Sequence, residues 1–292
     1  MSKTVGVLGL GIMGGAMSSS LAERGWTVIG YDPDAARCAE LAEVGVQIAT
    51  SAADVARRAP LILTSLPNPA VAASVAAEIA GSGAAGRIVM ETSTLTIEDK
   101  EAFRNILAAA GHIALDCPLS GTGAQARNRD LVVYASGDTA AIAQAMPVFS
   151  DFARQSVDLG AFGNGSKMKF IANLLVAIHN VAAAEAMVLG MRAGLDPHQL
   201  AEIAGSGAGG SRMFQMRAPM MADAVYEPAT MRISTWQKDM SIIGDFARQL
   251  GCPTPLLDAT APIYTRAYES GLGAQDTAAV CTVLEKMAGL ER

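Results

Sequence analysis

Cysteine and histidine are scarce in this chain, which has only 4 and 3 of them among 292 residues. Cys38, Cys117, Cys252 and Cys281 lie far apart, with no CxxC pair and no histidine at metal-ligand spacing. This scarcity argues against a disulfide framework, a metal site and a Ser-His-Asp triad. We therefore expect reduced thiols in a cytoplasmic protein.

Charge is also sparse, at 17% of the residues, and no basic stripe is present. The 28 acidic residues outnumber the 22 basic ones, which gives a net charge of −6. Nucleic-acid binding depends on clustered lysine and arginine at the phosphates, so we expect no nucleic-acid partner. Hydrophobic residues reach 51%, which excludes a disordered chain or a coiled coil and fits a well-packed globular protein.

We expect neither a signal peptide nor a membrane span. The first residues, MSKTVGVLGLG, enter a glycine-rich strand and turn directly. The apolar stretch 170–184 contains Asn and His and is bounded by Lys169 and Glu185. It therefore predicts a buried helix and is too short to cross a bilayer.

Up to about residue 160, short β-branched runs alternate with longer alanine-rich segments of helical period. This alternation predicts βαβ units and a parallel sheet covered by helices on both faces. Strands are expected at 4–9, 26–31, 61–66, 87–92, 112–117 and 131–136, and helices at 13–24, 34–44, 69–80 and 97–110.

Beyond this point no β pattern returns. A long helix is expected from Ser166 to about Arg192, followed by a flexible connection at 205–211 and by helices near 236–250, 255–270 and 276–288. The sequence thus predicts a doubly wound, mostly parallel α/β domain at 1–162. An all-α domain at 163–292, beginning with the long helix between the domains, is expected to follow.

A glycine-rich turn follows the first expected strand. Gly9, Gly11 and Gly14 form a GxGxxG pattern that a helix is expected to follow. The next expected strand ends at Tyr31, and Asp32 lies 18 residues after Gly14. This order of elements is the dinucleotide-binding fingerprint of a Rossmann domain. The glycines permit a tight turn and let a pyrophosphate approach the N-terminus of the helix.

Asp32 also bears on which nicotinamide cofactor binds. A carboxylate at this point accepts hydrogen bonds from the ribose hydroxyls of NAD and repels the 2′-phosphate of NADP. Pro33 and Asp34 follow, and the first cation is Arg37, one turn into the next expected helix. We therefore expect NAD, with NADP less favoured, and no compensating cation adjacent to Asp32.

Four segments resemble the motifs of the β-hydroxyacid dehydrogenase family, the 3-hydroxyisobutyrate dehydrogenase branch of the 6-phosphogluconate dehydrogenase superfamily. They are GLGIMG (9–14), DCPLSGTGAQA (116–126), GNGSKMKFIAN (163–173) and WQKDM (236–240), in the order and spacing of that family. The resemblance covers essentially the whole chain. It implies a NAD(P)-dependent oxidation of a small 3-hydroxy acid at a cleft between two domains, in a homodimer or homotetramer.

The resemblance also implies which residues bind cofactor and substrate. Cofactor contacts are expected at Gly9, Leu10, Gly11, Ile12, Met13, Gly14, Asp32, Leu66, Pro67, Asn68, Thr94 and Lys238. The substrate carboxylate is expected at Ser120, Gly121, Thr122 and Lys238. The family usually has a glycine where this chain has Thr122, and the added hydroxyl beside the substrate leaves the identity of the substrate open.

By the same resemblance, Lys169 matches the catalytic lysine of the family, and Asn173 lies one turn later. Positions i and i+4 share a helix face, so the two side chains converge on one substrate hydroxyl. A lysine accepts a proton near neutral pH only if its pKa falls from about 10.4 to roughly 7 to 8. Apolar surroundings, and a second cation such as Lys238, favour such a fall. The alternative is an ordinary solvated lysine.

The sequence alone is compatible with three functions. The leading one is hydride transfer between NAD and a 3-hydroxy acid, with Lys169 as general acid or base. The second is an imine or semialdehyde reductase of the same superfamily, and Lys169 disfavours the imine reductases because they commonly replace it. The third is a non-catalytic dinucleotide-binding regulator, in which the motif residues of the second half would have been replaced. Lys169, Asn173 and Lys238 are all present. Within the leading hypothesis, SRMF (211–214) with nearby Arg217 is more similar to the threonate-type branch of the family, which acts on four-carbon sugar acids, than to the branched-chain one.

Overall fold

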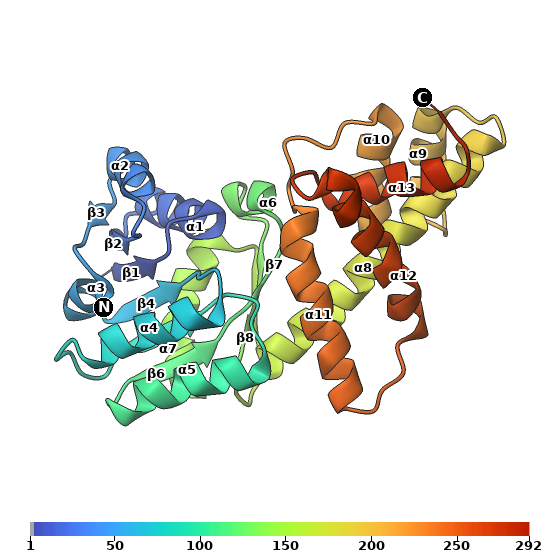
Figure 1. Ribbon diagram of the computed structural model, residues 1–292. Helices are drawn as coiled ribbons and strands as arrows, with labels where there is room; N and C mark the ends of the chain where they lie inside the picture. The colour runs from blue at the N-terminus through green and yellow to red at the C-terminus, as the bar shows by residue number, and fades with distance from the viewer. Residues whose placement is uncertain (1–2, 292) are drawn as a thin grey trace. The chain divides into compact units, whose positions relative to one another are not determined.

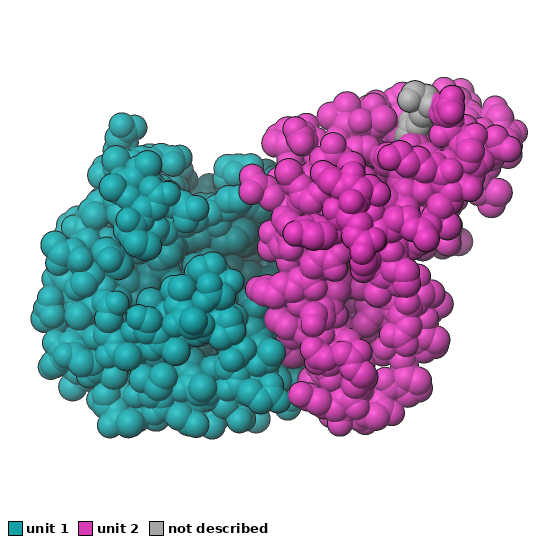
Figure 2. Space-filling model, in the orientation of Figure 1, with its two compact units in different colours: residues 1–169 teal, residues 170–292 magenta. Residues whose placement is uncertain are grey.

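The computed structural model describes residues 3–291. The chain forms two compact units, Met1–Lys169 and Phe170–Arg292, which are coloured separately in Figure 2. The sequence placed the start of the second domain at residue 163, whereas the units divide at Lys169, inside helix α8 (Asn164–Arg192).

A six-stranded parallel sheet lies at the centre of the first unit (Figure 1), in the order β3-β2-β1-β4-β5-β6. The order reverses between β1 and β4, and ligands of open α/β sheets bind at the carboxyl ends of the strands beside such a point. The strands are β1 (Thr4–Leu8), β2 (Thr27–Tyr31), β3 (Gln47–Ile48), β4 (Leu61–Thr64), β5 (Ile88–Glu91) and β6 (Ile113–Asp116).

Alternating side chains of the strands bury both faces of this sheet, as expected for a parallel sheet. Val7 and Leu63 belong to one buried cluster, whereas the adjacent Leu8 and Ile62 belong to another. Helices α1 (Ile12–Glu23), α2 (Ala35–Glu43) and α7 (Thr139–Phe152) contribute to the first cluster. Helices α3 (Ala52–Arg58), α4 (Pro69–Ala80) and α5 (Ile97–Ala109) contribute to the second.

The expected strand at 131–136 is present, but it does not join the main sheet. It forms β8 (Val132–Ala135) in a three-stranded sheet with β7 (Leu119–Ser120) and β9 (Gln155–Asp158). The pair β7/β8 is antiparallel, and β8/β9 is parallel. The main parallel sheet is as predicted, but the sheet that this strand joins was not, because strand periodicity does not indicate which neighbour a strand pairs with.

All regular elements described beyond Lys169 are helical, as predicted. The remaining helices are α9 (Pro197–Ser206), α10 (Arg212–Asp223), α11 (Ile233–Gln249), α12 (Pro255–Ala267), a π-helical turn (Tyr268–Leu272), a 3₁₀ turn (Thr277–Ala279) and α13 (Val280–Met287). The connection expected at 205–211 is shorter than predicted, because α9 continues to Ser206.

Helix α8 extends beyond the apolar stretch 170–184 at both ends. By length and composition alone its 29 residues are enough to cross a bilayer, with 44% of the most apolar window buried. A core helix of a water-soluble protein meets the same criterion, so this is weak support for a span. Within the second unit α8 makes polar contacts: Asn180, fully buried, donates to Tyr264 Oη and to the Thr277 carbonyl, both at 2.9 Å.

Candidate functional site

The glycine turn after β1 has a backbone that only glycines permit. Gly9 has a φ of +89°, in the left-handed region. A Cβ atom on Gly14 would lie 1.8 Å from the Gly9 carbonyl oxygen, so α1 packs this closely against the turn only with glycine there. Both glycines thus fulfil the roles that the GxGxxG pattern predicts for them.

The N-terminus of α1 suits an anion. Gly11 is the N-cap residue and has no side chain to accept hydrogen bonds from the first turn, which begins at Ile12. Backbone N–H groups at such a helix start point outward and carry the positive end of the helix dipole. The turn 9–14, with Leu10, Ile12 and Met13 between its glycines, therefore fits the pyrophosphate of a dinucleotide.

Asp32 lies beside this turn with its carboxylate already oriented. Its Oδ2 accepts a hydrogen bond of 2.8 Å from the Leu10 backbone, and its Oδ1 accepts one of 2.9 Å from the Asp34 backbone. The residue is only 8% exposed. A fixed carboxylate at the end of β2, next to the glycine turn, has the position that a ribose-binding acid requires.

The expectation that no cation stands next to Asp32 is wrong. Arg37 reaches back from α2, and its Nη1 lies 3.5 Å from Asp32 Oδ2. The same Nη1 would lie 3.4 Å from a Cβ atom on Gly11, which places the guanidinium over the turn as well. The sequence spacing indicates only a contact between Arg37 and Asp34, three residues before it. The contact with Asp32 forms because the Arg37 side chain folds back across the N-terminus of α2.

Two further loops expected to contact cofactor lie at the ends of β4 and β5. The Leu66 backbone N–H donates to Ser93 Oγ at 2.8 Å, which ties the loop of Leu66, Pro67 and Asn68 to the segment that carries Thr94. Asn68 is also the N-cap of α4, since its Oδ1 accepts from the Val71 backbone at 3.0 Å. Its side chain thus has a structural role in addition to any contact with a cofactor.

The expected substrate segment, Ser120 to Thr122, links β7 to the short helix α6 (Gly123–Arg127). Gly121 has a φ of +139°, and a Cβ atom there would lie 2.6 Å from Leu131 Cδ2. Thr122, the departure from the family pattern, forms a capping box with Gln125 at the start of α6. Its hydroxyl is therefore engaged with the helix, a role that the T-x-x-Q spacing signals. A Cβ atom on Gly123 would lie 2.4 Å from Ile12 Cγ2, so this segment borders the glycine turn.

Lys169 and Asn173 lie one turn apart on α8, as the sequence predicts. Lys169 is 9% exposed and Asn173 is 4% exposed, so neither is a solvated surface residue. Asn173 Nδ2 donates to Asp239 Oδ2 at 3.1 Å. This contact fixes the amide group and directs its carbonyl oxygen away from Asp239.

Asp239 contacts two of the expected site residues, which its position in the sequence does not reveal. It is 5% exposed, on α11, and lies 3.6 Å from the ammonium of the adjacent Lys238 through its Oδ1. Asp239 thereby joins two of the predicted site residues, Asn173 and Lys238, within the second unit. Its place inside WQKDM is the only signal in the sequence, and it fits a helix-start charge and a ligand equally well.

Arg217, close to the SRMF segment, is buried and forms an ion pair within the second unit. It is 3% exposed, and its Nη1 lies 2.8 Å from Asp276 Oδ1 and 2.7 Å from Thr230 Oγ1. Asp276 in turn accepts from the backbone N–H groups of Thr230 and Met231 at 2.8 and 3.1 Å.

Residues 3–291 contain no group of three or more His, Cys, Asp or Glu side chains able to hold a metal.

Both halves of the chain match known families. Residues 4–161 match the NAD binding domain of 6-phosphogluconate dehydrogenase, and residues 163–284 match the family described as NAD-binding of NADP-dependent 3-hydroxyisobutyrate dehydrogenase. An L-threonate dehydrogenase of Cupriavidus necator is 33% identical, over 97% of this chain and 96% of that protein. Glyoxylate/succinic semialdehyde reductase 1 of Arabidopsis thaliana is 31% identical, over 94% of this chain and 96% of that protein.

Solved structures agree with these matches. A 3-hydroxyisobutyrate dehydrogenase of Salmonella typhimurium is 31% identical and has a TM-score of 0.87, covering 96% of this chain and 99% of that one. An imine reductase of Streptomyces aurantiacus has a TM-score of 0.64 at 20% identity, which shows a shared fold alone.

Proposed function

Because the chain belongs to the NAD-binding β-hydroxyacid dehydrogenase family, we propose that it transfers a hydride between NAD and the hydroxyl-bearing carbon of a small 3-hydroxy acid. The proposal rests most directly on Lys169, a buried lysine on the face of α8 that also carries Asn173. A regulator without catalytic activity would not need either side chain at these positions.

In the proposed oxidation, Lys169 in its neutral form accepts the proton of the substrate hydroxyl. NAD, when bound, supplies the acceptor for the hydride that leaves the same carbon, so that alcohol becomes carbonyl and the electrons balance. Asn173, held by Asp239 at 3.1 Å, orients the hydroxyl toward the lysine. In the reverse direction the Lys169 ammonium returns the proton to the carbonyl oxygen.

We assign the substrate carboxylate to the segment of Ser120 to Thr122. Gly121 cannot carry a side chain without meeting Leu131, and the Thr122 backbone N–H already donates to Gln125 Oε1 at 3.0 Å. We therefore assign the anion chiefly to the Ser120 hydroxyl and the Gly121 backbone. Because the Thr122 hydroxyl is engaged in a capping box, it contributes less to the choice of substrate than its place in the motif implies. The relatives named as L-threonate dehydrogenases favour a four-carbon sugar acid.

We assign the cofactor as NAD. The oriented carboxylate of Asp32 supports this choice, since it repels an additional phosphate on the ribose. Arg37, 3.5 Å from that carboxylate, offsets part of the repulsion. The expected preference for NAD is therefore moderate, and NADP remains a usable second cofactor.

A reductase acting on a semialdehyde is the second candidate, favoured by the 31% identity to glyoxylate/succinic semialdehyde reductase 1. Both candidates use the same site in opposite directions. The test is a panel followed by NADH absorbance: L-threonate and 3-hydroxyisobutyrate with NAD, and succinic semialdehyde and a cyclic imine with NADH. Turnover of a hydroxy acid supports the leading proposal, turnover of the semialdehyde alone supports the second, and turnover of the imine alone contradicts both.

The carboxylate assignment has its own control in the same assay. The methyl ester of the best acid should lose most of the activity, because the donors that bind the anion are then left unpaired. Equal kcat/KM for acid and ester would contradict a carboxylate site at residues 120–122.

A further inference from the structure

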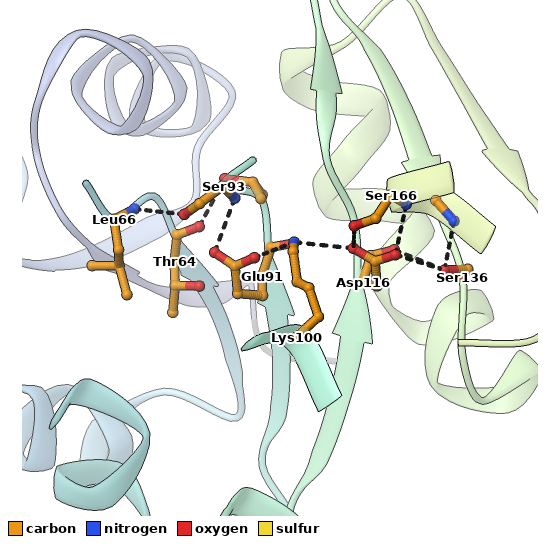
Figure 3. A network of polar contacts seen from close by, with 10 residues as sticks. Thr64, Leu66, Glu91, Ser93, Lys100, Asp116, Ser136 and Ser166 are labelled. Atoms are coloured by element: carbon orange, nitrogen blue, oxygen red, sulfur yellow. Dashed lines mark hydrogen bonds and ion pairs between the residues drawn. The ribbon is translucent and has the colours of Figure 1, made fainter. Parts of the chain in front are cut away.

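A lysine is fully buried in the first unit, outside the glycine turn and the expected substrate segment. Lys100 on α5 has no exposed surface, and its ammonium pairs with Glu91 Oε2 at the end of β5 and with Asp116 Oδ1, 3.0 Å away, at the end of β6. Figure 3 shows the three side chains meeting above the ends of these strands. One ammonium against two carboxylates leaves one excess negative charge.

Burial of such a group is costly unless each charge is paired. Removal from water by itself lowers the pKa of Lys100, but the carboxylates of Glu91 and Asp116 outweigh this effect and raise the pKa above its ordinary value. Lys100 is therefore charged at any physiological pH. Apolar side chains in place of a buried ion pair are often equally stable, so stability alone does not account for this cluster.

The excess negative charge faces the beginning of α8. Asp116 Oδ2 accepts from the Ser166 backbone at 2.7 Å, and Asp116 Oδ1 accepts from Ser166 Oγ at 2.8 Å. Ser136 Oγ donates to Asp116 Oδ2 at 3.3 Å and accepts from the Gly165 backbone at 2.9 Å. The carboxylate thus satisfies the Ser166 N–H directly and the Gly165 N–H through Ser136, and it lies at the positive end of the α8 dipole.

The other carboxylate of the cluster faces the cofactor loops. Glu91 Oε1 accepts from the Ser93 backbone at 2.9 Å, and Ser93 Oγ accepts from the Leu66 backbone at 2.8 Å. Lys100 also donates to the Glu91 carbonyl at 3.2 Å. A continuous set of polar contacts therefore runs from the loop after β4, through Lys100, to the first turn of α8, as the dashed lines in Figure 3 show.

We propose that Lys100 is a positioning residue: by joining Glu91 to Asp116, it holds the first turn of α8, and with it Lys169, in a fixed place relative to the loops at the ends of β4 and β5. Lys169 lies three residues after Ser166, which is one helical turn on the same face. The catalytic part of this inference rests on the proposed function. The structural part, the fixing of the helix start, does not.

The structural part is tested by hydrogen exchange of the peptide that covers residues 163–173. In Lys100→Met the amides of Gly165 and Ser166 should exchange at least about tenfold faster than in the wild type, because local opening becomes easier. The matched control is Leu107→Ala, on the same helix α5 and fully buried within an apolar cluster. Equal exchange in wild type and Lys100→Met, or the same acceleration in Leu107→Ala, would overturn the inference.

Lys100→Met leaves two buried carboxylates without their cation and is expected to be less stable. The double variant Glu91→Gln/Lys100→Met removes one charge of each sign and keeps the same net charge in the cluster. We expect it to regain thermal stability but not activity: a displacement of about 1 Å at Lys169 can lower kcat about 100-fold, with little change in NAD affinity. Recovery of kcat together with Tm would show that Lys100 only balances charge, and would contradict a positioning role.

The two proposals fail in different ways. If Lys169 is not the proton acceptor, Lys169→Ala retains activity, yet the exchange difference at Gly165 and Ser166 persists in Lys100→Met. If the proposed function is right and Lys100 has no positioning role, Lys169→Ala loses activity while the double variant at Glu91 and Lys100 has normal kcat. Each combination of results therefore decides between them.

Discussion

Arg37 illustrates how one side chain alters a specificity argument made from sequence. Its guanidinium lies 3.5 Å from Asp32 and 3.4 Å from Asp34, so the acidic pair at the end of β2 carries a cation of its own. The spacing D-P-D-x-x-R shows that an i,i+3 contact is possible, but it does not show that Arg37 also reaches Asp32. That contact depends on how the chain turns between β2 and α2.

We predict that Arg37→Ala sharpens the preference for NAD over NADP. Without the guanidinium, no cation at position 37 offsets the repulsion between the Asp32 carboxylate and the 2′-phosphate of NADP. The charge-assisted hydrogen bond that Arg37 would donate to this phosphate is also lost. The ratio of kcat/KM for NAD to that for NADP should rise about tenfold, equivalent to about 1.4 kcal/mol. Arg57→Ala is the matched control, since Arg57 is similarly exposed and lies 3.5 Å from Asp54 in the same i,i+3 geometry. An unchanged ratio in Arg37→Ala would place the guanidinium outside the ribose site.

Lys100 and Asp239 could not be assigned from the sequence. Lys100 lies in a segment, IEDKEAF, whose charges suggest a solvated helix face. Its partners Glu91 and Asp116 lie at the ends of strands β5 and β6. The contact of Asp116 with Ser166 joins residues 50 positions apart. Asp239 acts on Asn173 over 66 positions. Such contacts follow from the fold and not from local spacing.

Among the secondary-structure elements, long and strongly patterned segments were predicted well. The six expected strands are all present within two residues of their predicted bounds, because buried parallel strands are continuous β-branched runs. The two-residue strands β3 and β7 have no periodicity to detect. The five-residue helix α6 was also missed, although the Thr122–Gln125 capping box marks its start.

At the amino end of the main sheet, His112 joins two elements in a way that depends on pH. It is 3% exposed just before β6, and its Nδ1 accepts a hydrogen bond of 3.1 Å from the Arg87 backbone just before β5. Burial is the main cause that lowers the pKa of His112 below 6.5, and the charge of Arg87 adds to it, while the Ile79 backbone opposes them. The folded state therefore favours neutral histidine.

A pH dependence of stability follows. Because the pKa of His112 is lower in the folded state, its contribution is fully present above pH 6.5 and is lost as the pH falls through the folded value. The free energy of unfolding, measured with urea at pH 8 and pH 5.5, should fall less in His112→Asn than in the wild type. Asparagine retains an acceptor near the position of Nδ1 but does not titrate. An equal fall in both proteins would mean that His112 is not a source of the pH dependence.

For the whole molecule, α8 presents an apolar stripe. Ile171, Leu175 and Leu189 are 54%, 46% and 73% exposed. At about 100° per residue they lie within about 40° of one another around the helix. Large exposed apolar side chains on one side of a helix are typical of an interaction site. We propose that the chain forms a homodimer or homotetramer in which this stripe is covered.

Sedimentation velocity at micromolar concentration tests the assembly. We expect a mass of two or four chains, and Leu189→Glu should shift it toward the monomer, because a buried charge at an interface is unfavourable. Lys167→Ala, at an exposed position of the same helix, should leave the mass unchanged. A wild-type mass of 30.1 kDa, that of one chain, would refute this assembly.

The central claim is that Lys169 transfers the proton, and kcat of two variants at this position tests it most directly. We predict that Lys169→Ala lowers kcat by about 10² to 10⁴-fold with little change in the Kd of NAD, and that Lys169→Arg is nearly as poor, since a guanidinium retains its proton. Lys167→Ala, two residues earlier and exposed, should retain normal kcat. Substantial activity in Lys169→Arg would instead make Lys169 an anion-binding charge, and full activity in both variants would contradict the account.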